Sequence, residues 1–503
     1  LNIEFREVTI YERNPYILSC VGLLCYINEN HSTIKEVGSM ETKGNENFFE
    51  KVFHLSENHT DVKTEVVAGI TTFMTMAYIL AVNPSILSAT GMDSGAIFTA
   101  TALAALVATL LMAAFANYPF VLAPGMGLNA YFAYTVVLNM GYTWEMALAA
   151  VFVEGLIFIL LSLTNVREAI FNAIPMNLKH AVSVGIGLFI AFIGLQNAKI
   201  VVDGATLVSV YSFKGALTDG TFNSVGITVL LAIIGILITA ILVVKNVKGN
   251  ILWGILATWI LGMICQAVGL YQPNPELGMY SVFPDLSSGF GIKSMAPTFF
   301  KLDFSRVFSL DFLVVMFAFL FVDMFDTLGT LIGVASKADM LDKDGKLPHI
   351  KGALMADAVG TSVGALFGTS TTTTFVESAS GVSEGGRTGL TAVVAAILFG
   401  LSLFLSPIFL AIPSFATAPA LVVVGFLMLT SITKIDFNDF TEAIPCYIAI
   451  IAMPFMYSIS EGIAMGVISY VVINLVTGHA KEKKISTLMY VLAVLFVLKY
   501  ILI

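Results

Sequence analysis

Charged residues are scarce in this sequence: Asp, Glu, Lys and Arg make up 12% of its 503 residues, against about 25% in soluble domains. Hydrophobic residues make up 57%, and the mean hydropathy is +0.89. So little charge and so much apolar side chain are typical of a protein that crosses the membrane many times. The net charge of −9 lies mostly in loops and argues against a nucleic-acid partner.

Motifs for catalysis and for nucleotide-driven pumping are missing as well. The sequence has no glycine-rich phosphate loop and no HExxH motif, and it leaves no room for a soluble nucleotide-binding domain, which excludes an ATP-driven pump. The six histidines lie in loops or at span ends, which argues against an intramembrane enzyme. No cofactor or metal is expected, because the cysteines show neither metal-ligand nor disulfide spacing; they are Cys20, Cys25, Cys265 and Cys446.

Apolar runs of about the length that crosses a bilayer begin at Val66. They predict an all-α polytopic membrane protein with fourteen transmembrane spans in two sets of seven. The spans are 66–89, 96–115, 119–138, 144–163, 181–198, 224–244 and 249–270, then 310–334, 349–367, 368–386, 388–410, 417–433, 441–458 and 461–478. A further apolar run, Leu488–Ile503, either spans the membrane or lies in its interface.

The charges of the loops predict the orientation. Lys and Arg gather in alternate loops, whereas the short loops between them hold none, which predicts a cytoplasmic N-terminus in a bacterial-type plasma membrane. Residues 40–65 form an amphipathic lead-in on the cytoplasmic side. Residues 1–39 share no pattern with the rest, so our hypothesis is that the native start is Met40; a signal peptide is the competing interpretation.

The two halves of the chain echo each other. Val66–Phe115 laid on Ala318–Phe367, a shift of 252 (318 − 66), aligns Phe73 with Phe325 and Thr109 with Thr361, among other matches. Because seven spans per half is an odd number, the second copy must be inverted in the membrane.

Two of the predicted spans are interrupted. In the tenth, Gly368–Gly386, a run of four threonines favours extended backbone, a short helix of small residues follows, and Glu377 falls at the junction. In the third, Pro124 and its neighbouring glycines break the helix with a short extended segment, and Asn129 is a candidate N-cap for its second half. Broken spans that carry an acid are typical of the ligand site of a secondary transporter. The alternative is a re-entrant loop in which Glu377 only caps a helix.

The eighth span carries a polar stripe. Asp323, Asp326, Thr327 and Thr330 are spaced i, i+3, i+4 and i+7, which is one helix face. Two carboxylates one turn apart in low dielectric cannot both ionise cheaply, and a proton-coupled carrier needs such a group. A structural pair satisfied by backbone N–H groups is the alternative. Two lone acids in apolar runs, Glu154 and Asp357, are equally open to a structural or a substrate role.

Four segments carry a family resemblance: TSTTTTFVESASGV, FVDMFDTLGTLIGVASKADM, APGMGLNAYFAY and AGITTFMTMAYILAVNP. From about Val66 to the C-terminus the chain resembles the AzgA-like branch of the nucleobase–cation symporter-2 family, the purine permeases of hypoxanthine/guanine type. The resemblance implies a UraA-like fold of seven plus seven inverted spans. Its core domain would comprise 66–163 and 310–410 and its gate domain 181–270 and 417–478, with 485–503 as an extra C-terminal apolar segment.

The resemblance also implies purine uptake coupled to protons. Glu377 and Asp323 would be the principal binding acids, with Asn129 and Asp326 supporting and with Asp323 and Asp326 in the proton path; the other candidate substrate contacts are Thr374, Phe375 and Ser378. The uracil and xanthine branches carry a glutamate where Asp323 stands, so the chain departs towards the purine-base branch. The expected partners are a purine, protons and the lipid bilayer, with a homodimer as one option. Three questions stay open. They are which purine is preferred, whether the substrate is instead adenine, uracil, xanthine or an anion, and whether sodium replaces the proton.

Overall fold

The computed structural model describes residues 48–163, 174–205, 207–284, 289–337, 340 and 347–502. The hypothesis about residues 1–39 and Met40 lies outside these ranges. The chain forms two compact units, Leu1–His54 and Leu55–Ile503. In the first, the described part is the short helix α4 (Phe48–Phe53). The second unit holds every element named below.

The elements of its first half follow the predicted spans in order. They are α5 (Val62–Met76), α6 (Ile79–Leu87), η1 (Ser88–Thr90), α7 (Ser94–Ala116), β1 (Leu122–Pro124), α8 (Met126–Ala130), the π-helix η2 (Tyr131–Asn139), α9 (Trp144–Leu163), α11 (Met176–Asn197), β2 (Val201–Asp203), β3 (Val208–Val210), α12 (Phe213–Thr218), the π-helix η3 (Phe222–Gly226), α13 (Ile227–Val244), α14 (Asn250–Ala267) and η4 (Pro275–Leu277). Asp61 and Asp93 cap α5 and α7 by accepting from Thr64 N at 3.0 Å and Ala96 N at 2.7 Å.

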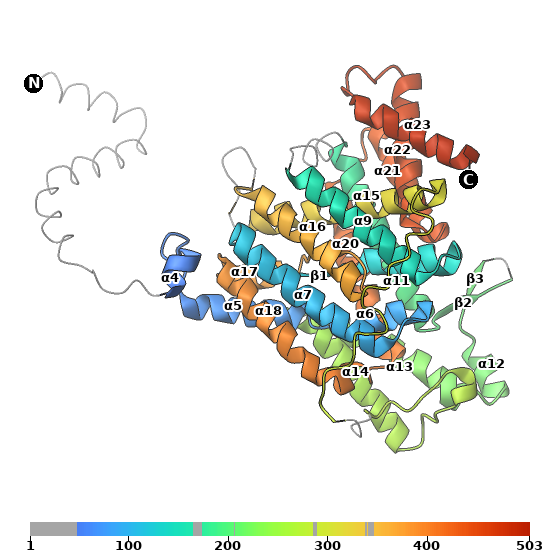
Figure 1. Ribbon diagram of the computed structural model, residues 1–503. Coiled ribbons are helices and arrows are strands. Elements are labelled where there is room, and N and C mark those ends of the chain that lie inside the picture. Colours follow the sequence, from blue (N-terminus) through green and yellow to red (C-terminus); the bar gives the residue numbers. More distant parts are fainter. Residues whose placement is uncertain are drawn as a thin grey trace, which may run out of the picture. The chain divides into compact units, whose positions relative to one another are not determined.

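The second half again places one short strand, β4 (Thr372–Thr374), between helices (Figure 1). It consists of α15 (Leu310–Lys337), α16 (Ile350–Phe367), β4 (Thr372–Thr374), α17 (Ser378–Ser383), α18 (Gly389–Ser402), η5 (Leu403–Leu405), α19 (Ser406–Phe409), α20 (Ser414–Leu429), η6 (Thr430–Lys434), α21 (Phe440–Phe455), α22 (Ile459–Val476) and α23 (Thr487–Leu502). Helix α23 shows that the final apolar run of the sequence is helical.

Ten helices among the described residues are long and apolar enough to cross a membrane, and three shorter apolar helices accompany them. The protein is therefore an all-helical, multi-pass membrane protein. The third and tenth predicted spans are not among the ten, because a three-residue strand interrupts each of them. The prediction of extended segments at these two places agrees with the structure.

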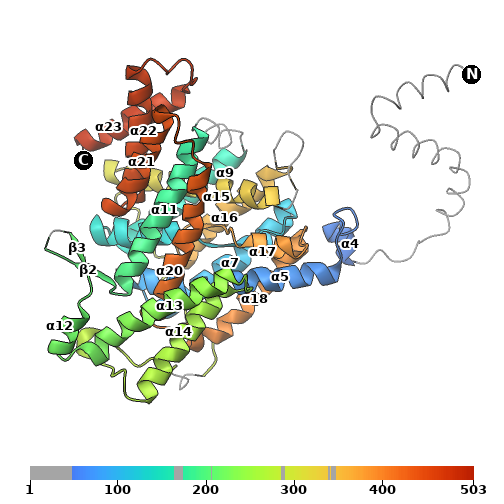
Figure 2. The ribbon, with the colours of Figure 1, turned by 180° about the vertical axis from the view of Figure 1, so that it is seen from behind.

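Small residues let helices from the two halves approach closely. In α7 the fully buried Ala96, Ala100, Ala104 and Ala108 recur every four residues, which makes a stripe without bulky side chains. This helix packs against α16 and α18, and α16 also packs against α9 (Figure 1). A second group forms where α11 packs against α20 and α21, and where α13 packs against α14 and α20 (Figure 2).

The first predicted span differs in detail from the structure. The sequence predicts one helix over 66–89, whereas the helix is interrupted between Met76 and Ile79. Pro84, one turn beyond the interruption, has no N–H to donate and its ring crowds the carbonyl one turn before it. The interruption leaves Tyr78 between the two helical pieces, fully enclosed by protein.

Candidate functional site

The two broken spans meet as a pair of antiparallel strands. In β1 and β4, Leu122 pairs with Thr374, Ala123 with Thr373 and Pro124 with Thr372. The ladder continues at both ends, because Gly125 N donates to Thr371 O and Phe375 N donates to Val121 O, each at 3.0 Å. All the strand residues are buried. Each interrupted span thus satisfies the other's backbone, which is what irregular structure at membrane depth requires.

One threonine from each half holds its own strand. The Thr109 hydroxyl on α7 accepts from Leu122 N at 3.0 Å and donates to Leu122 O at 3.1 Å. The Thr361 hydroxyl on α16 donates to Thr372 O at 3.0 Å. The internal alignment of the sequence matches these two threonines, so the two halves share this contact.

Gly125 allows the strands to lie close to α15. A Cβ atom there would lie 2.7 Å from Thr373 Cγ2, closer than atoms pack, and 3.6 Å from Asp326 Oδ2. A side chain at this position would therefore push apart β4 and the acidic face of α15.

Glu377 receives a hydrogen bond that the sequence does not suggest. Tyr78 OH donates to Glu377 Oε1 at 2.6 Å, across 299 positions of the chain. Glu377 is the N-cap residue of α17, yet its side chain makes no capping hydrogen bond, so the interpretation of a merely capping glutamate does not describe it. The Tyr78 hydroxyl instead fixes a partly exposed carboxylate at the end of β4.

Asp323 lies deeper than the second acid of its helix. Its side chain is fully buried, and Thr327 Oγ1 lies 3.0 Å from Asp323 Oδ1. The same hydroxyl lies 3.0 Å from Asp357 Oδ1 on α16 and 2.6 Å from Thr373 Oγ1 on β4. Asp323, Asp357, Thr327 and Thr373 therefore form one buried polar cluster, which we call the Thr327 cluster.

Asp326 faces the paired strands instead. It is half-buried, near Gly125, and close enough to Glu377 and Asp357 for their charges to interact. Within the described part of the chain, no hydrogen bond reaches the Asp326 carboxylate. The structure thus brings Asp326, Glu377 and Tyr78 together, while Asp323 is more deeply buried and belongs to the Thr327 cluster.

The threonines of the second broken span alternate between two sides of the strand. Thr371 Oγ1 donates to Glu154 Oε2 at 2.9 Å, and Thr373 belongs to the Thr327 cluster. The hydroxyls of Thr372 and Thr374 are buried and, within the described ranges, have no hydrogen-bond partner. Thr374 therefore carries an unsatisfied polar group one turn from Glu377.

The three remaining candidates make contacts within the protein. Ser378 Oγ accepts from Val121 N at 3.0 Å, and Phe375 is buried with its amide in the ladder. Asn129 is fully buried; its amide donates to Pro124 O at 3.3 Å, and its oxygen accepts from Ser370 Oγ. These bonds tie the two broken spans together.

The prediction that Asn129 caps the second half-helix is wrong. Helix α8 begins at Met126, with Gly125 as its N-cap residue, and Asn129 lies inside the helix. The strand ends at Pro124, so the helix begins four residues earlier than an N-cap at Asn129 predicts (129 − 125).

Glu65 is a buried acid that sequence analysis missed. It is fully buried and accepts from Arg387 N at 2.8 Å, Thr391 N at 3.1 Å and Thr391 Oγ1 at 2.6 Å, and so binds α5 to the start of α18. Its position one residue before the predicted first span made it look like a loop residue. The Arg387 side chain donates to Val382 O and Gly386 O, each at 2.8 Å. Within the described ranges, no three His, Cys, Asp or Glu side chains form a metal-binding group.

Comparison with known proteins identifies the family of the chain. Residues 63–465 match the model of the Permease family. The guanine/hypoxanthine permease PbuO of Bacillus subtilis is 44% identical over 450 residues, which cover 88% of this chain and 98% of that protein. The adenine permease AdeP of Escherichia coli is 41% identical over 462 residues, 92% of this chain and 97% of the relative.

Among solved structures, the transmembrane domain of the cyanobacterial bicarbonate transporter BicA superimposes with a TM-score of 0.56 at 17% identity, over 80% of this chain and 97% of that domain. At this identity the likeness concerns the fold alone. The family match covers most of the chain and confirms the resemblance carried by the four sequence segments. The chain belongs to the Permease family, in its AzgA-like nucleobase–cation symporter-2 branch, and is a membrane transporter rather than an enzyme.

Proposed function

We propose that this permease imports purine nucleobases together with protons, with hypoxanthine and guanine as its preferred substrates. The observation that carries the proposal is the Glu377 carboxylate, which Tyr78 fixes beside Asp326 at the paired strands. A neutral purine is flat and presents N–H donors next to carbonyl or ring-nitrogen acceptors. Glu377 accepts from the donors, and the buried Thr374 hydroxyl, which has no hydrogen-bond partner within the described ranges, donates to an acceptor.

In this proposal Asp326 rather than Asp323 is the acid of α15 that lies nearest the substrate. Asp326 is half-buried on the strand side of the helix, while Asp323 is fully buried against Thr327. Asn129, Phe375 and Ser378 hold the backbone of the site through the contacts described above.

Asp323 handles the proton through the Thr327 cluster. The Thr327 hydroxyl has one proton to donate and lies 3.0 Å from two carboxylates. A proton on either carboxyl group completes the hydrogen bonding of the cluster. Because Thr373 links this cluster to β4, protonation and occupancy of the site would be coupled.

The proposed architecture is fourteen spans in two inverted sets of seven. The ten long helices, two of the three shorter ones and the two broken spans together account for that number (10 + 2 + 2). The core, 66–163 and 310–410, contains α7, α16 and α18 with the paired strands, and the gate, 181–270 and 417–478, contains the group around α11 and α20. The packing of the helices into these two groups supports the division.

The relatives support the substrate class. They are named as guanine/hypoxanthine permeases and as adenine permeases, so adenine is the second candidate. Uptake of radiolabelled hypoxanthine into cells that express the chain tests the proposal. We expect competition by guanine and a weaker effect of adenine, with no competition by uracil, xanthine or bicarbonate. Competition by bicarbonate alone would instead favour an anion carrier on the same fold.

The proposed orientation has a cytoplasmic N-terminus in the plasma membrane. Cysteines introduced at the exposed positions Asp219 and Glu276 should react with an impermeant thiol reagent added outside intact cells, and a cysteine at Asn438 should not. The opposite labelling pattern would invert the topology. Chemical cross-linking of the same cells tests the homodimer.

A further inference from the structure

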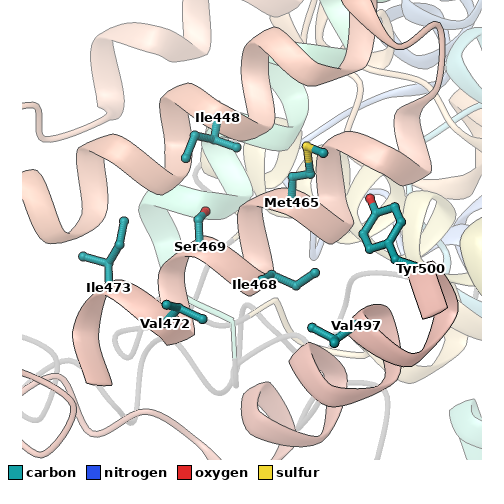
Figure 3. A pocket seen from close by; sticks show the side chains of 8 residues that line it. All are labelled: Ile448, Met465, Ile468, Ser469, Val472, Ile473, Val497 and Tyr500. Atoms are coloured by element: carbon teal, nitrogen blue, oxygen red, sulfur yellow. The ribbon is translucent and has the colours of Figure 1, made fainter. Parts of the chain in front are cut away.

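The C-terminal helix α23 forms one wall of a cavity that lies outside the permeation site. The cavity measures about 510 Å³, within the range of small-molecule pockets. Three helices line it: Ile448 comes from α21, Met465, Ile468 and Val472 from α22, and Val497 and Tyr500 from α23 (Figure 3).

Among the described residues that line the cavity, none offers a ligand a free polar group. The Ser469 hydroxyl in its lining donates to Gly466 O of its own helix at 3.1 Å. The Tyr500 hydroxyl donates to Glu461. A purine bound here would leave its ring nitrogens and carbonyl groups unpaired, which makes an apolar chain the fitting occupant.

The rim of the cavity faces the apolar surroundings of the protein. Val472 is 50% exposed, Val497 41% and Tyr447, on the adjoining turn of α21, 57%. Exposed apolar side chains are expected where α22, a candidate membrane span, meets acyl chains. The cavity therefore opens to the bilayer.

Basic residues adjoin one end of the cavity. Ile473 lies at one end of the lining and Tyr500 at the other (Figure 3). Ile473 is three residues, about 4.5 Å of helix rise, before the end of α22. The loop that follows carries Lys481, Glu482, Lys483 and Lys484.

The three lysines of this loop differ in availability. Lys483 lies between Asp439 and Glu442, whose hydrogen bonds raise the pKa of its ammonium group. Lys481 and Lys484 are exposed, with only Glu482 between them to offset their charge. Two exposed lysines, with no ion pair among the described residues, in the loop that follows a cavity-lining helix match the headgroup of an anionic lipid, and the apolar cavity matches its tail.

We propose that α21, α22 and α23 bind one anionic phospholipid of the surrounding bilayer. One acyl chain fills the cavity, and the phosphate-bearing headgroup meets Lys481 and Lys484. The site is separate from the paired strands, and it gives the C-terminal helix a function that the permease fold itself does not require.

The test uses the full-length protein in detergent with added phosphatidylglycerol, phosphatidylcholine of the same acyl chains, or glycerophosphoglycerol, which has the headgroup without the chains. Lipid retention in native mass spectrometry and the Tm are the readouts. We expect phosphatidylglycerol to be retained and to raise the Tm, phosphatidylcholine to act less, and glycerophosphoglycerol to have no effect. An equal effect of glycerophosphoglycerol would overturn the proposal of a chain in the cavity.

Two variants fill the cavity from opposite walls, Ser469→Phe on α22 and Val497→Trp on α23. Each should weaken phosphatidylglycerol binding at least about tenfold, while Val476→Phe, an exposed position at the end of α22, should leave it unchanged. Lys481→Gln with Lys484→Gln should remove the preference for phosphatidylglycerol over phosphatidylcholine. Undiminished lipid binding in both filled variants would overturn the site. The variant Val472→Cys tests for a second copy of the chain in the cavity. If it cross-links into a dimer, and added lipid does not lower the yield of that dimer, the cavity belongs to a dimer interface.

Discussion

The two broken spans share a backbone and differ in their chemistry. Each contributes one short strand to the same pair. A threonine from the second span of the same half holds each strand: Thr109 on α7 holds β1, and Thr361 on α16 holds β4. The first carries Leu122, Ala123 and Pro124, with no polar side chain in the strand. The second carries Thr372, Thr373 and Thr374, and Glu377 follows it.

The difference between the two strands indicates which broken span carries the side chains of the proposed site. The first broken span provides close approach, because Gly125 leaves room for Thr373 and Asp326. The second provides hydroxyls and a carboxylate, which can bind a polar ligand or hold a proton. In the proposed inverted repeat, the two copies would share the backbone geometry, and only the second copy would carry the proposed ligand-binding side chains.

The largest effect is expected from Glu377→Gln, which removes the charge of the second broken span. We expect purine binding to weaken by about 2–4 kcal/mol, roughly 30- to 900-fold, because a charge-assisted contact is lost. Calorimetry on the purified protein measures this. Glu384→Gln, at the other end of α17 and paired with the exposed Lys248, is the matched control and should bind normally. Normal affinity in Glu377→Gln would remove the chemical asymmetry between the spans.

Tyr78→Phe should have the next largest effect. It keeps the ring and deletes the hydroxyl that fixes Glu377, so purine affinity should fall by about 2 kcal/mol, roughly 30-fold. Tyr271→Phe deletes a hydroxyl that donates to Tyr280 O at 2.6 Å after α14, and it should leave purine affinity unchanged. Equal effects of the two substitutions would mean that Tyr78 matters only for stability.

Gly125→Ala tests the contribution of the first broken span. The added methyl group would meet Thr373 Cγ2, and the resulting shift should cost at least about 1 kcal/mol of binding, roughly fivefold in affinity. Gly291→Ala is the control, because no atom lies within 4 Å of a Cβ there. If both variants bind purine like the parent protein, close approach at Gly125 is not required.

The smallest effects concern the threonines that the two halves share. Thr109→Val and Thr361→Val should each lower thermal stability by about 1 kcal/mol per lost hydrogen bond. Thr109 makes two bonds to its strand and Thr361 one, so Thr109→Val should lower the Tm further. Thermal unfolding of the two purified variants in detergent measures which Tm is lower. A reversed order would show that the two strands are held differently from what their contacts indicate.

Much of the fold could be predicted from the sequence because apolar length and the repeat determine it. Glu377 stands out as an acid within a broken span. Tyr78 does not, because a tyrosine in an apolar helix looks like a core residue until its partner, 299 positions away, is known. Asn129 looks like a helix cap, although the helix has already begun at Met126.

The spacing of Asp323 and Asp326 in the sequence does not show which of these two acids of α15 lies beside the paired strands. Positions i and i+3 share a helix face but lie about 60° apart around the axis. That rotation buries Asp323 against Thr327 and leaves Asp326 half-exposed beside the paired strands. Only the packing of α16 and β4 around α15, which depends on distant parts of the chain, determines which acid lies beside the paired strands.

The most direct test separates purine binding from proton coupling in one preparation. Vesicles reconstituted with Asp323→Asn are given an imposed pH gradient and radiolabelled hypoxanthine, and the same vesicles are assayed for exchange at equal pH. Because Asp323 belongs to the Thr327 cluster, whereas Tyr78 holds Glu377, we expect exchange to persist and accumulation against a gradient to be lost. Vesicles with Asp323→Asn that still concentrate hypoxanthine under the pH gradient alone would contradict the assignment of the proton to this cluster.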